Sequence, residues 1–178
     1  MTLWVFGYGS LLWDPGFEIS ERVTARLDGY HRSFCMSSIH HRGTETHPGL
    51  VLALDAQDGA FCTGLALAAK PGTEDQTLDY LRERELISSA YVERTVNLSL
   101  EDGREVNALA YVINRDHRQY CGSLGFEKQA QIIASASGGR GPNCEYLYRT
   151  SSQLNALGLN DPDLDWLASR VRALKASA

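Results

Sequence analysis

The chain has 178 residues, which is enough for one ordinary domain with a single core and too few for two full catalytic domains. Its composition, 43% hydrophobic and 22% charged, excludes disordered and collagen-like classes. Seventeen basic and 22 acidic side chains leave a net charge of −5, which disfavours binding to nucleic acid or to anionic membranes. No export signal opens the chain and no apolar run approaches ~18 residues. We therefore expect residues 1–178 to form a single soluble, cytoplasmic domain with neither nucleic acid nor membrane as a partner.

The first two-thirds of the chain show the pattern of strands separated by turns. A short apolar strand over 2–6 ends at glycines, and a long irregular strand is expected over 22–39. Asp-Gly dipeptides favour tight turns between antiparallel strands. They predict two hairpins, one joining 49–56 to 60–69 through Asp58-Gly59, the other joining 92–100 to 106–112 through Asp102-Gly103.

The last third, and one segment between the hairpins, show helical spacing. Thr73-Glu74-Asp75-Gln76 matches a capping box and predicts a helix from Glu74 to Leu86. Further helices are expected from Phe126 to a stop at Gly138-Gly139, from near Asn143, and from Asp161-Pro162 through Leu174. Hairpins with segregated helices predict an α+β fold, with a closed or nearly closed sheet carrying helices on its outside.

Cys35, Cys62, Cys121 and Cys144 are far apart in the sequence and form no Cys-x-x-Cys pair. This spacing is atypical of zinc sites and of redox dithiols, so we expect reduced, buried thiols. The alternative is a disulfide pair in a secreted protein.

The loop Gly7-Tyr8-Gly9-Ser10-Leu11 follows the first strand. Two glycines and a serine there can point successive backbone amides into one concavity that suits a carboxylate or phosphate. A dinucleotide fingerprint would need a third glycine where Leu12 stands. The alternative is a plain tight turn, and spacing alone leaves both interpretations open.

Glu85 lies on the apolar face of its predicted helix. At ~100° per residue, Leu78, Leu81 and Glu85 fall within about 60° of arc, whereas Glu83 points roughly 160° away from Glu85. A carboxylate turned toward a core is poorly solvated, which suits it to proton transfer near neutrality. Alternatively, Glu85 ends its helix in an ion pair with a neighbouring arginine.

Histidines gather at His40-His41-Arg42-Gly43, with His47 nearby. Adjacent histidines on an extended segment point in opposite directions and no second ligand pair completes a shell, so no metal is expected. A histidine paired with a cysteine could form a thiol nucleophile, although no spacing selects one cysteine. Structural hydrogen bonding is the other interpretation.

One stretch, Val5-Phe6-Gly7-Tyr8-Gly9-Ser10-Leu11-Leu12-Trp13, resembles the opening of the ChaC-type, glutathione-specific γ-glutamylcyclotransferases. Further landmarks of that family follow in register over residues 3–150: Tyr30, Phe34, His41-Arg42-Gly43, Pro48-Gly49, Tyr80-Leu81, Arg84-Glu85 and Glu145-Tyr146-Leu147. The resemblance implies a compact mixed β-barrel with flanking helices.

The same resemblance implies cleavage of glutathione to 5-oxoproline and Cys-Gly, without water or a cofactor. Glu85 is the implied catalytic residue. The implied substrate-binding residues are Val5, Phe6, Gly7, Tyr8, Gly9, Ser10 and Leu11, with Arg42, Tyr91 and Tyr146 as candidate pocket residues. Two features depart from the family pattern: the span from Glu85 to Tyr91 is longer, and Arg140 does not directly precede Asn143.

Two other functions remain compatible with the sequence. One is a non-catalytic module that binds γ-glutamyl compounds or regulates cation transport, and the other is a Cys/His amidase working through an acyl-enzyme. A buried tyrosine is also commonly a core residue with one satisfied hydroxyl, which is the alternative role of Tyr8, Tyr91 and Tyr146.

Overall fold

A computed structural model describes residues 1–86, 89–122 and 124–177 of the chain. The fold divides into two compact units. Unit 1 comprises Met1–Ser33 and Ala53–His117, and unit 2 comprises Phe34–Leu52 and Arg118–Ala178. That the whole chain acts as a single domain stays a prediction.

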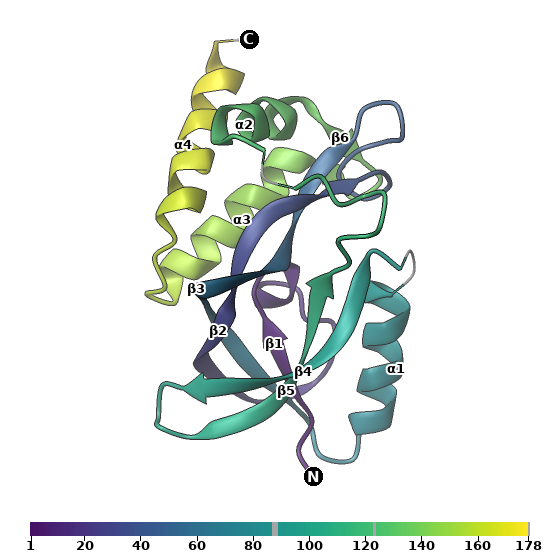
Figure 1. Cartoon of the computed structure of the whole chain (residues 1–178), viewed down its shortest axis with the longest axis vertical. Helices are drawn as coiled ribbons and strands as arrows, with labels where there is room; N and C mark the ends of the chain where they lie inside the picture. The colour runs from purple at the N-terminus through teal and green to yellow at the C-terminus, as the bar shows by residue number, and fades with distance from the viewer. Residues whose placement is uncertain (87–88, 123, 178) are drawn as a thin grey trace. The chain divides into compact units, whose positions relative to one another are not determined.

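A closed five-stranded barrel has the strand order β1-β3-β2-β4-β5 and a further β3–β5 pairing (Figure 1). Its strands are β1 (Trp4–Gly7), β2 (Ile19–Ser38), β3 (Gly49–Ala69), β4 (Tyr91–Leu100) and β5 (Glu105–Ile113). β1 pairs antiparallel with β3 and parallel with β5. Inside unit 1 the interior is apolar: Phe6, Leu67 and Leu98 are fully buried. The expected α+β class with a barrel is confirmed.

The hairpin of β4 and β5 matches the predicted one. The register runs from Tyr91 opposite Ile113 to Ser99 opposite Glu105. Gly103 takes a φ of +91° in the turn, a conformation that glycine adopts without a steric penalty. On β4 the even positions from 96 to 100 are buried, so the odd positions face away from the barrel interior.

The other predicted hairpin is wrong, because 49–69 is one continuous strand. Gly59 does take a φ of +79°, as the Asp-Gly signal suggests. The chain nevertheless stays extended because its flanks pair with other strands and not with each other. Leu54 is opposite Val112 on β5, and Leu65 is opposite Gly7 on β1.

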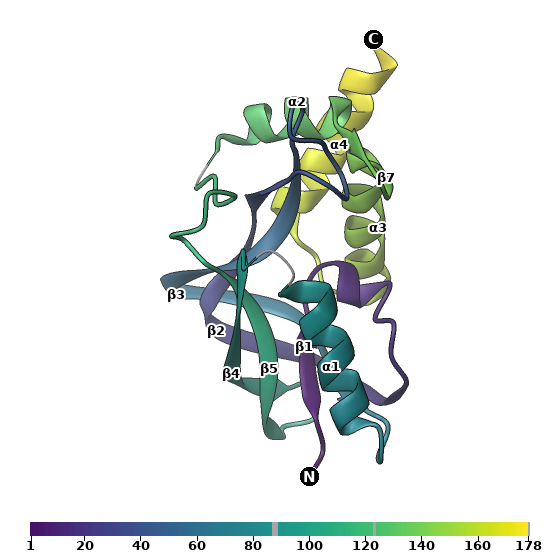
Figure 2. The same ribbon diagram turned by 90° about the vertical axis from the view of Figure 1, so that its right-hand side faces the viewer.

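Helix α1 (Glu74–Glu85) belongs to unit 1 and runs beside the barrel strands in both views (Figures 1 and 2). It begins where predicted, but the capping box does not form. The Thr73 hydroxyl donates to the Lys70 carbonyl instead of accepting from the helix, and the Glu74 carboxylate accepts from the Gly72 amide. A one-turn 3₁₀ helix, η1 (Ser10–Leu12), follows β1.

Unit 2 contains the helices α2 (Phe126–Ser135), α3 (Asn143–Ala156) and α4 (Pro162–Ala176), and the two-residue strands β6 (Ser137–Gly138) and β7 (Gly141–Pro142). Helix α2 ends before the predicted glycine stop, because Gly138 pairs with Gly141 in the small β6–β7 sheet. Asp161 caps α4 as predicted: its carboxylate accepts from the Leu164 amide at 3.2 Å.

The four cysteines are thiols, as expected, and Cys121 differs from the others in being partly exposed. Among the helices within the described ranges, none combines the length and the hydropathy needed to cross a membrane.

Candidate active site

The loop after β1 is fixed by contacts within unit 1. Arg32 donates to the Tyr8 carbonyl at 2.7 Å and to the Thr63 carbonyl at 2.9 Å. The Tyr8 hydroxyl donates to the Tyr111 carbonyl at 2.7 Å. Because the carbonyl and the following N–H of a trans peptide point in opposite directions, the Gly9 amide is directed away from Arg32. The loop therefore presents this donor on the side that Arg32 does not occupy.

Arg84, near the end of α1, connects the helix to this loop. Its guanidinium donates to the Ser10 hydroxyl at 3.0 Å, to the Asp14 carbonyl at 2.7 Å and to the Tyr80 hydroxyl at 3.0 Å. Its side chain is 9% exposed. A planar guanidinium with several fixed partners holds its neighbours in place better than a flexible ammonium does.

The Glu85 carboxylate lies 3.5 Å from Nε of Arg84, and its side chain is only 15% exposed. Glu83, two residues earlier, is exposed. The orientation inferred from helical spacing agrees with the structure. Glu85 also forms an ion pair with Arg84, as the alternative interpretation expects. Its geometry is therefore compatible with a catalytic role and with a purely structural ion pair. Its catalytic role stays a prediction.

A second acidic residue, Glu93, lies at the same end of α1. Arg82 donates to Glu93 at 3.1 Å, and the Tyr111 hydroxyl donates to Glu93 at 3.0 Å. Burial, followed by the hydrogen bond to Glu93, raises the pKa of Tyr111, and the Glu85 charge acts on it in the same direction. Tyr111 is therefore a neutral donor beside two carboxylates.

Arg32, Glu93 and Tyr111 were not among the site residues predicted from the sequence. The signal for the last two lies in the β4–β5 hairpin, since its register places Glu93 directly opposite Tyr111. Tyr91, a candidate pocket residue, begins β4 and shares the outer face with Glu93 by strand alternation. Residues 87 and 88, in the span between Glu85 and Tyr91, lie outside the described residues.

The first predicted substrate-binding residues lie in β1. Val5 and Phe6 are fully buried, and they pair with Leu67 and Ala66 of β3. Leu11 is also buried. The side chains of Val5, Phe6 and Leu11 contribute to the core, and the backbone of Val5 and Phe6 is paired with β3. The candidate backbone donors to a substrate are therefore the amides of residues 8–10. Substrate binding by this stretch stays a prediction.

The other candidate pocket residues, Arg42 and Tyr146, belong to unit 2. Arg42 is 5% exposed, donates to the Pro142 carbonyl at 3.1 Å and lies 3.8 Å from Glu145. Burial lowers the pKa of Arg42, while Glu145 opposes that shift. The Tyr146 hydroxyl accepts from the Leu52 amide at 3.2 Å. The place of Arg42 and Tyr146 in a substrate pocket stays a prediction.

The histidine cluster has structural contacts within unit 2. The carbonyls of His40 and His41 accept from the amides of Gly139 and Arg140. His47 shares a hydrogen bond of 3.0 Å with the Ser135 hydroxyl. These contacts agree with the structural interpretation of the cluster.

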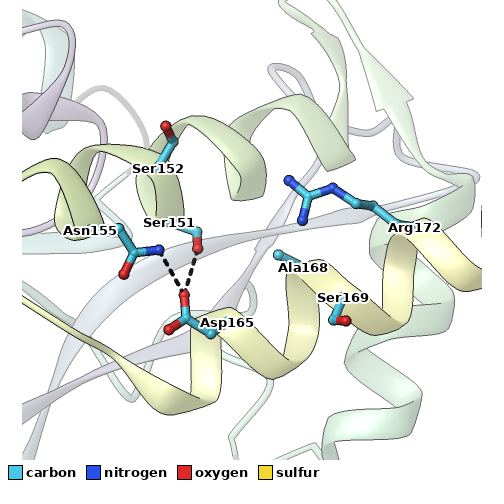
Figure 3. A pocket seen from close by; sticks show the side chains of 7 residues that line it. All are labelled: Ser151, Ser152, Asn155, Asp165, Ala168, Ser169 and Arg172. Carbon is cyan, nitrogen blue, oxygen red and sulfur yellow. Dashed lines mark hydrogen bonds between the residues drawn. The ribbon is translucent and has the colours of Figure 1, made fainter.

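An open cavity of about 420 Å³ lies between α3 and α4 in unit 2 (Figure 3). Its residues are Ser151, Ser152, Asn155, Asp165, Ala168, Ser169 and Arg172, together called here the Asp165 pocket. Ser151 and Asn155 both donate to one oxygen of Asp165 at 3.0 Å, as the dashed lines show.

Comparisons with known proteins identify the family. The family model described as ChaC-like protein matches residues 3–174. The glutathione-specific γ-glutamylcyclotransferase of Escherichia coli (strain K12) is 38% identical over 174 residues, covering 98% of this chain and 74% of the relative. Glutathione-specific γ-glutamylcyclotransferase 1 of Homo sapiens is 34% identical over 176 residues, covering 97% and 78%. A crystal structure of the yeast γ-glutamylcyclotransferase specific to glutathione superposes with a TM-score of 0.90 at 23% identity, covering 99% of this chain and 98% of that one, and so shares the fold. The chain belongs to the ChaC-like protein family.

Proposed function

We propose that this chain is a glutathione-specific γ-glutamylcyclotransferase that cleaves glutathione to 5-oxoproline and cysteinylglycine, with Glu85 as the proton-transferring residue. The names of the bacterial and human relatives support the reaction. The largely buried Glu85 carboxylate, beside an arginine that also holds the glycine loop, is the observation that carries the assignment of the site.

The reaction is an intramolecular acyl transfer. The α-amine of the γ-glutamyl group attacks its own γ-carbonyl carbon, and the new C–N bond closes a five-membered ring. The tetrahedral intermediate then collapses, breaking the amide bond to the cysteinyl nitrogen. The attacking nitrogen begins as an ammonium with three hydrogens and ends as the ring amide with one, so it loses two protons. The departing nitrogen gains two, one as the C–N bond breaks and one as the released amine becomes an ammonium, so the atoms balance without water. Because both reacting groups belong to one molecule, the protein must fold the substrate into the reactive geometry.

Glu85 is suited to both proton transfers. Its carboxylate has little access to water, and a positioned carboxylate can take a proton from the ammonium and return it to the leaving nitrogen. The ion pair with Arg84 fixes its position on α1. A single carboxylate can therefore act first as the base and then as the acid.

In this proposal, the loop at Tyr8, Gly9 and Ser10 supplies the electrostatic stabilisation of negative charge on the substrate. Its amides hold the substrate's α-carboxylate or the developing oxyanion, both of which need donors fixed before the reaction. Arg32 fixes the backbone at the Tyr8 carbonyl, and Arg84 fixes the Ser10 side chain. Arg84 is thus a positioning residue that links the loop to Glu85.

Product analysis tests the reaction directly. Purified protein is incubated with glutathione, and the products are separated by chromatography. We expect 5-oxoproline and cysteinylglycine in equal amounts. Hydrolysis by water would release free glutamate instead, and a module that only binds γ-glutamyl compounds would leave glutathione unconsumed. Either result would overturn the proposal.

Thiol alkylation separates this reaction from a Cys/His amidase. Cys35, Cys62 and Cys144 are buried, so their sulfur atoms are shielded from a substrate, and the partly exposed Cys121 is the thiol that iodoacetamide reaches first. We expect 5-oxoproline release to survive treatment with iodoacetamide under native conditions. An acyl-enzyme mechanism would instead lose activity in proportion to the alkylated thiol.

A further inference from the structure

Two cysteines distant in sequence lie opposite each other in unit 2. Met36 of β2 and Tyr120 form an isolated antiparallel bridge. The Cys121 amide donates to the Cys35 carbonyl at 2.8 Å, and the Ser37 amide donates to the Gln119 carbonyl at 2.7 Å. These two hydrogen bonds lie on either side of the bridge. Cys35 and Cys121 are therefore the opposed pair next to Met36 and Tyr120.

Opposed residues of an antiparallel pair point their side chains to the same face. Ser37 shares that face with Cys35, because the two are separated by one residue on the strand. Because Cys121 is opposed to Cys35, its side chain points to this face as well. The Cys121 sulfur also lies 4.0 Å from the Phe34 carbonyl. Both sulfur atoms therefore lie on one face of the bridge.

The Cα spacing of such a pair suits a disulfide bond, whereas the Cβ atoms must come closer together. Hydrogen-bonded opposed residues have Cα atoms about 5.5 Å apart, and disulfides most often span about 5.5–6 Å between Cα atoms. The Cβ atoms of opposed residues are about 4.5–5.5 Å apart, whereas a disulfide needs about 3.5–4.5 Å. Because hydrogen-bonded pairs lie at the wide end of that range, the two segments must move together by about 1–2 Å. A single isolated bridge resists that movement less than a long ladder would.

We propose that Cys35 and Cys121 form a redox modification site, which closes to an intramolecular disulfide by exchange with a small-molecule disulfide. Cys121 is partly exposed and Cys35 is fully buried, so Cys121 is the attacking residue. Burial raises the pKa of the Cys121 thiol and the Ser37 hydrogen bond opposes that shift. This exchange is independent of the γ-glutamyl reaction.

The exchange has two balanced steps. The Cys121 thiolate attacks one sulfur of the small disulfide, forms a mixed disulfide and releases the first small thiolate. The Cys35 thiolate then attacks the Cys121 sulfur and releases the second. Two electrons pass from the protein thiols to the oxidant, and the two protons go to the released thiolates. The small disulfide is reduced to two thiols as the protein disulfide forms.

Mass spectrometry of the full chain tests the proposal. Hydroxyethyl disulfide is the oxidant, because a glutathione buffer would also contain the substrate of the proposed reaction. We expect the native protein to lose two hydrogens in mass and two of its four titratable thiols. Tryptic digestion without reductant should link the peptide of residues 33–42 to that of residues 119–128, each of which contains one cysteine. Dithiothreitol should restore the original mass.

Two variants complete the test. Cys144→Ser removes another buried thiol of unit 2 and should still lose two hydrogens. Cys121→Ser should lose none. The proposal is wrong if the wild-type protein keeps all four thiols, if a different pair of peptides is linked, or if Cys121 stops at a mixed disulfide. The wild-type peptide map decides the question even if a variant fails to fold.

Discussion

Each unit of the protein contains a polar cluster built from the same groups: a guanidinium, a serine hydroxyl and a carboxylate. In unit 1, Arg84 lies between Ser10 and Glu85, and both charged side chains are largely buried. In unit 2, Asp165 accepts from a serine and an asparagine across the α3–α4 cavity, and Arg172 lies at the same cavity. There, both charged residues are exposed.

This difference shows that solvation, and not residue type, separates the two clusters. Charges interact far more strongly where water is excluded than at an exposed surface. Arg172 is already stacked 4.5 Å from the Tyr148 ring, and Asp165 is held by neutral donors. The Asp165 pocket thus has the interactions of a helix–helix contact, whereas the cluster of Arg84, Ser10 and Glu85 contains a carboxylate that is largely shielded from water.

The largest expected effect is that of Glu85→Gln. The amide has almost the same shape as the carboxylate but cannot accept the ammonium proton, so turnover should fall on the order of 10²-fold or more. The measurement is the rate of 5-oxoproline release from glutathione. Glu83→Gln, at an exposed position on the same helix, is the matched control and should keep the parental rate. If Glu85→Gln kept the parental turnover, the buried Glu85 would not be the proton-transferring residue, and burial would not give its cluster a chemical role.

Arg84→Lys should have the next largest effect. Lysine keeps the charge but cannot reach Ser10, Asp14 and Tyr80 together, so the loop and Glu85 lose their common anchor. We expect a loss of about tenfold in kcat/KM, smaller than the roughly 10²-fold that a 1 Å misplacement can cost, because lysine keeps the charge beside Glu85. Steady-state kinetics with glutathione gives the value.

The control for that prediction is Arg172→Lys, the corresponding change at the Asp165 pocket, which should leave kcat/KM unchanged. A loss confined to protein stability, with kcat/KM of folded Arg84→Lys at the parental value, would contradict the positioning role.

Glu93→Gln tests how a partly buried carboxylate contributes to stability in unit 1. The hydrogen bond from Arg82 holds the pKa of Glu93 below its ordinary value of 4.5. A group with a lowered folded-state pKa contributes stability above its unfolded pKa, and this contribution is lost as pH falls through the lower folded value. Wild type should therefore exceed Glu93→Gln by about 1 kcal/mol in unfolding free energy near neutrality.

Urea unfolding at a series of pH values checks this prediction. The gap between the two proteins should narrow below pH 4.5 as the wild-type carboxyl takes up its proton. A gap that stays constant down to strongly acidic pH would show that the ionised form of Glu93 contributes nothing.

Much of unit 1 could be predicted from local patterns. Helical spacing oriented Glu85, and the Asp102-Gly103 turn set the β4–β5 register. The wrong predictions came where long-range pairing overrode a local signal. Asp58-Gly59 did not turn the chain because its flanks pair with β1 and β5. The contact of Arg84 with Ser10 joins residues 74 positions apart, so no local periodicity could reveal it.

The smallest effect is expected for Asp165→Asn. The amide oxygen still accepts hydrogen bonds from Ser151 and Asn155, and an exposed carboxylate contributes little stability through charge alone. Unfolding free energy should change by less than about 0.5 kcal/mol, and 5-oxoproline release should be unchanged. Urea unfolding and the product assay measure both. A large fall in activity would show that the exposed cluster of unit 2 takes part in the reaction, and solvation would then no longer separate the two clusters.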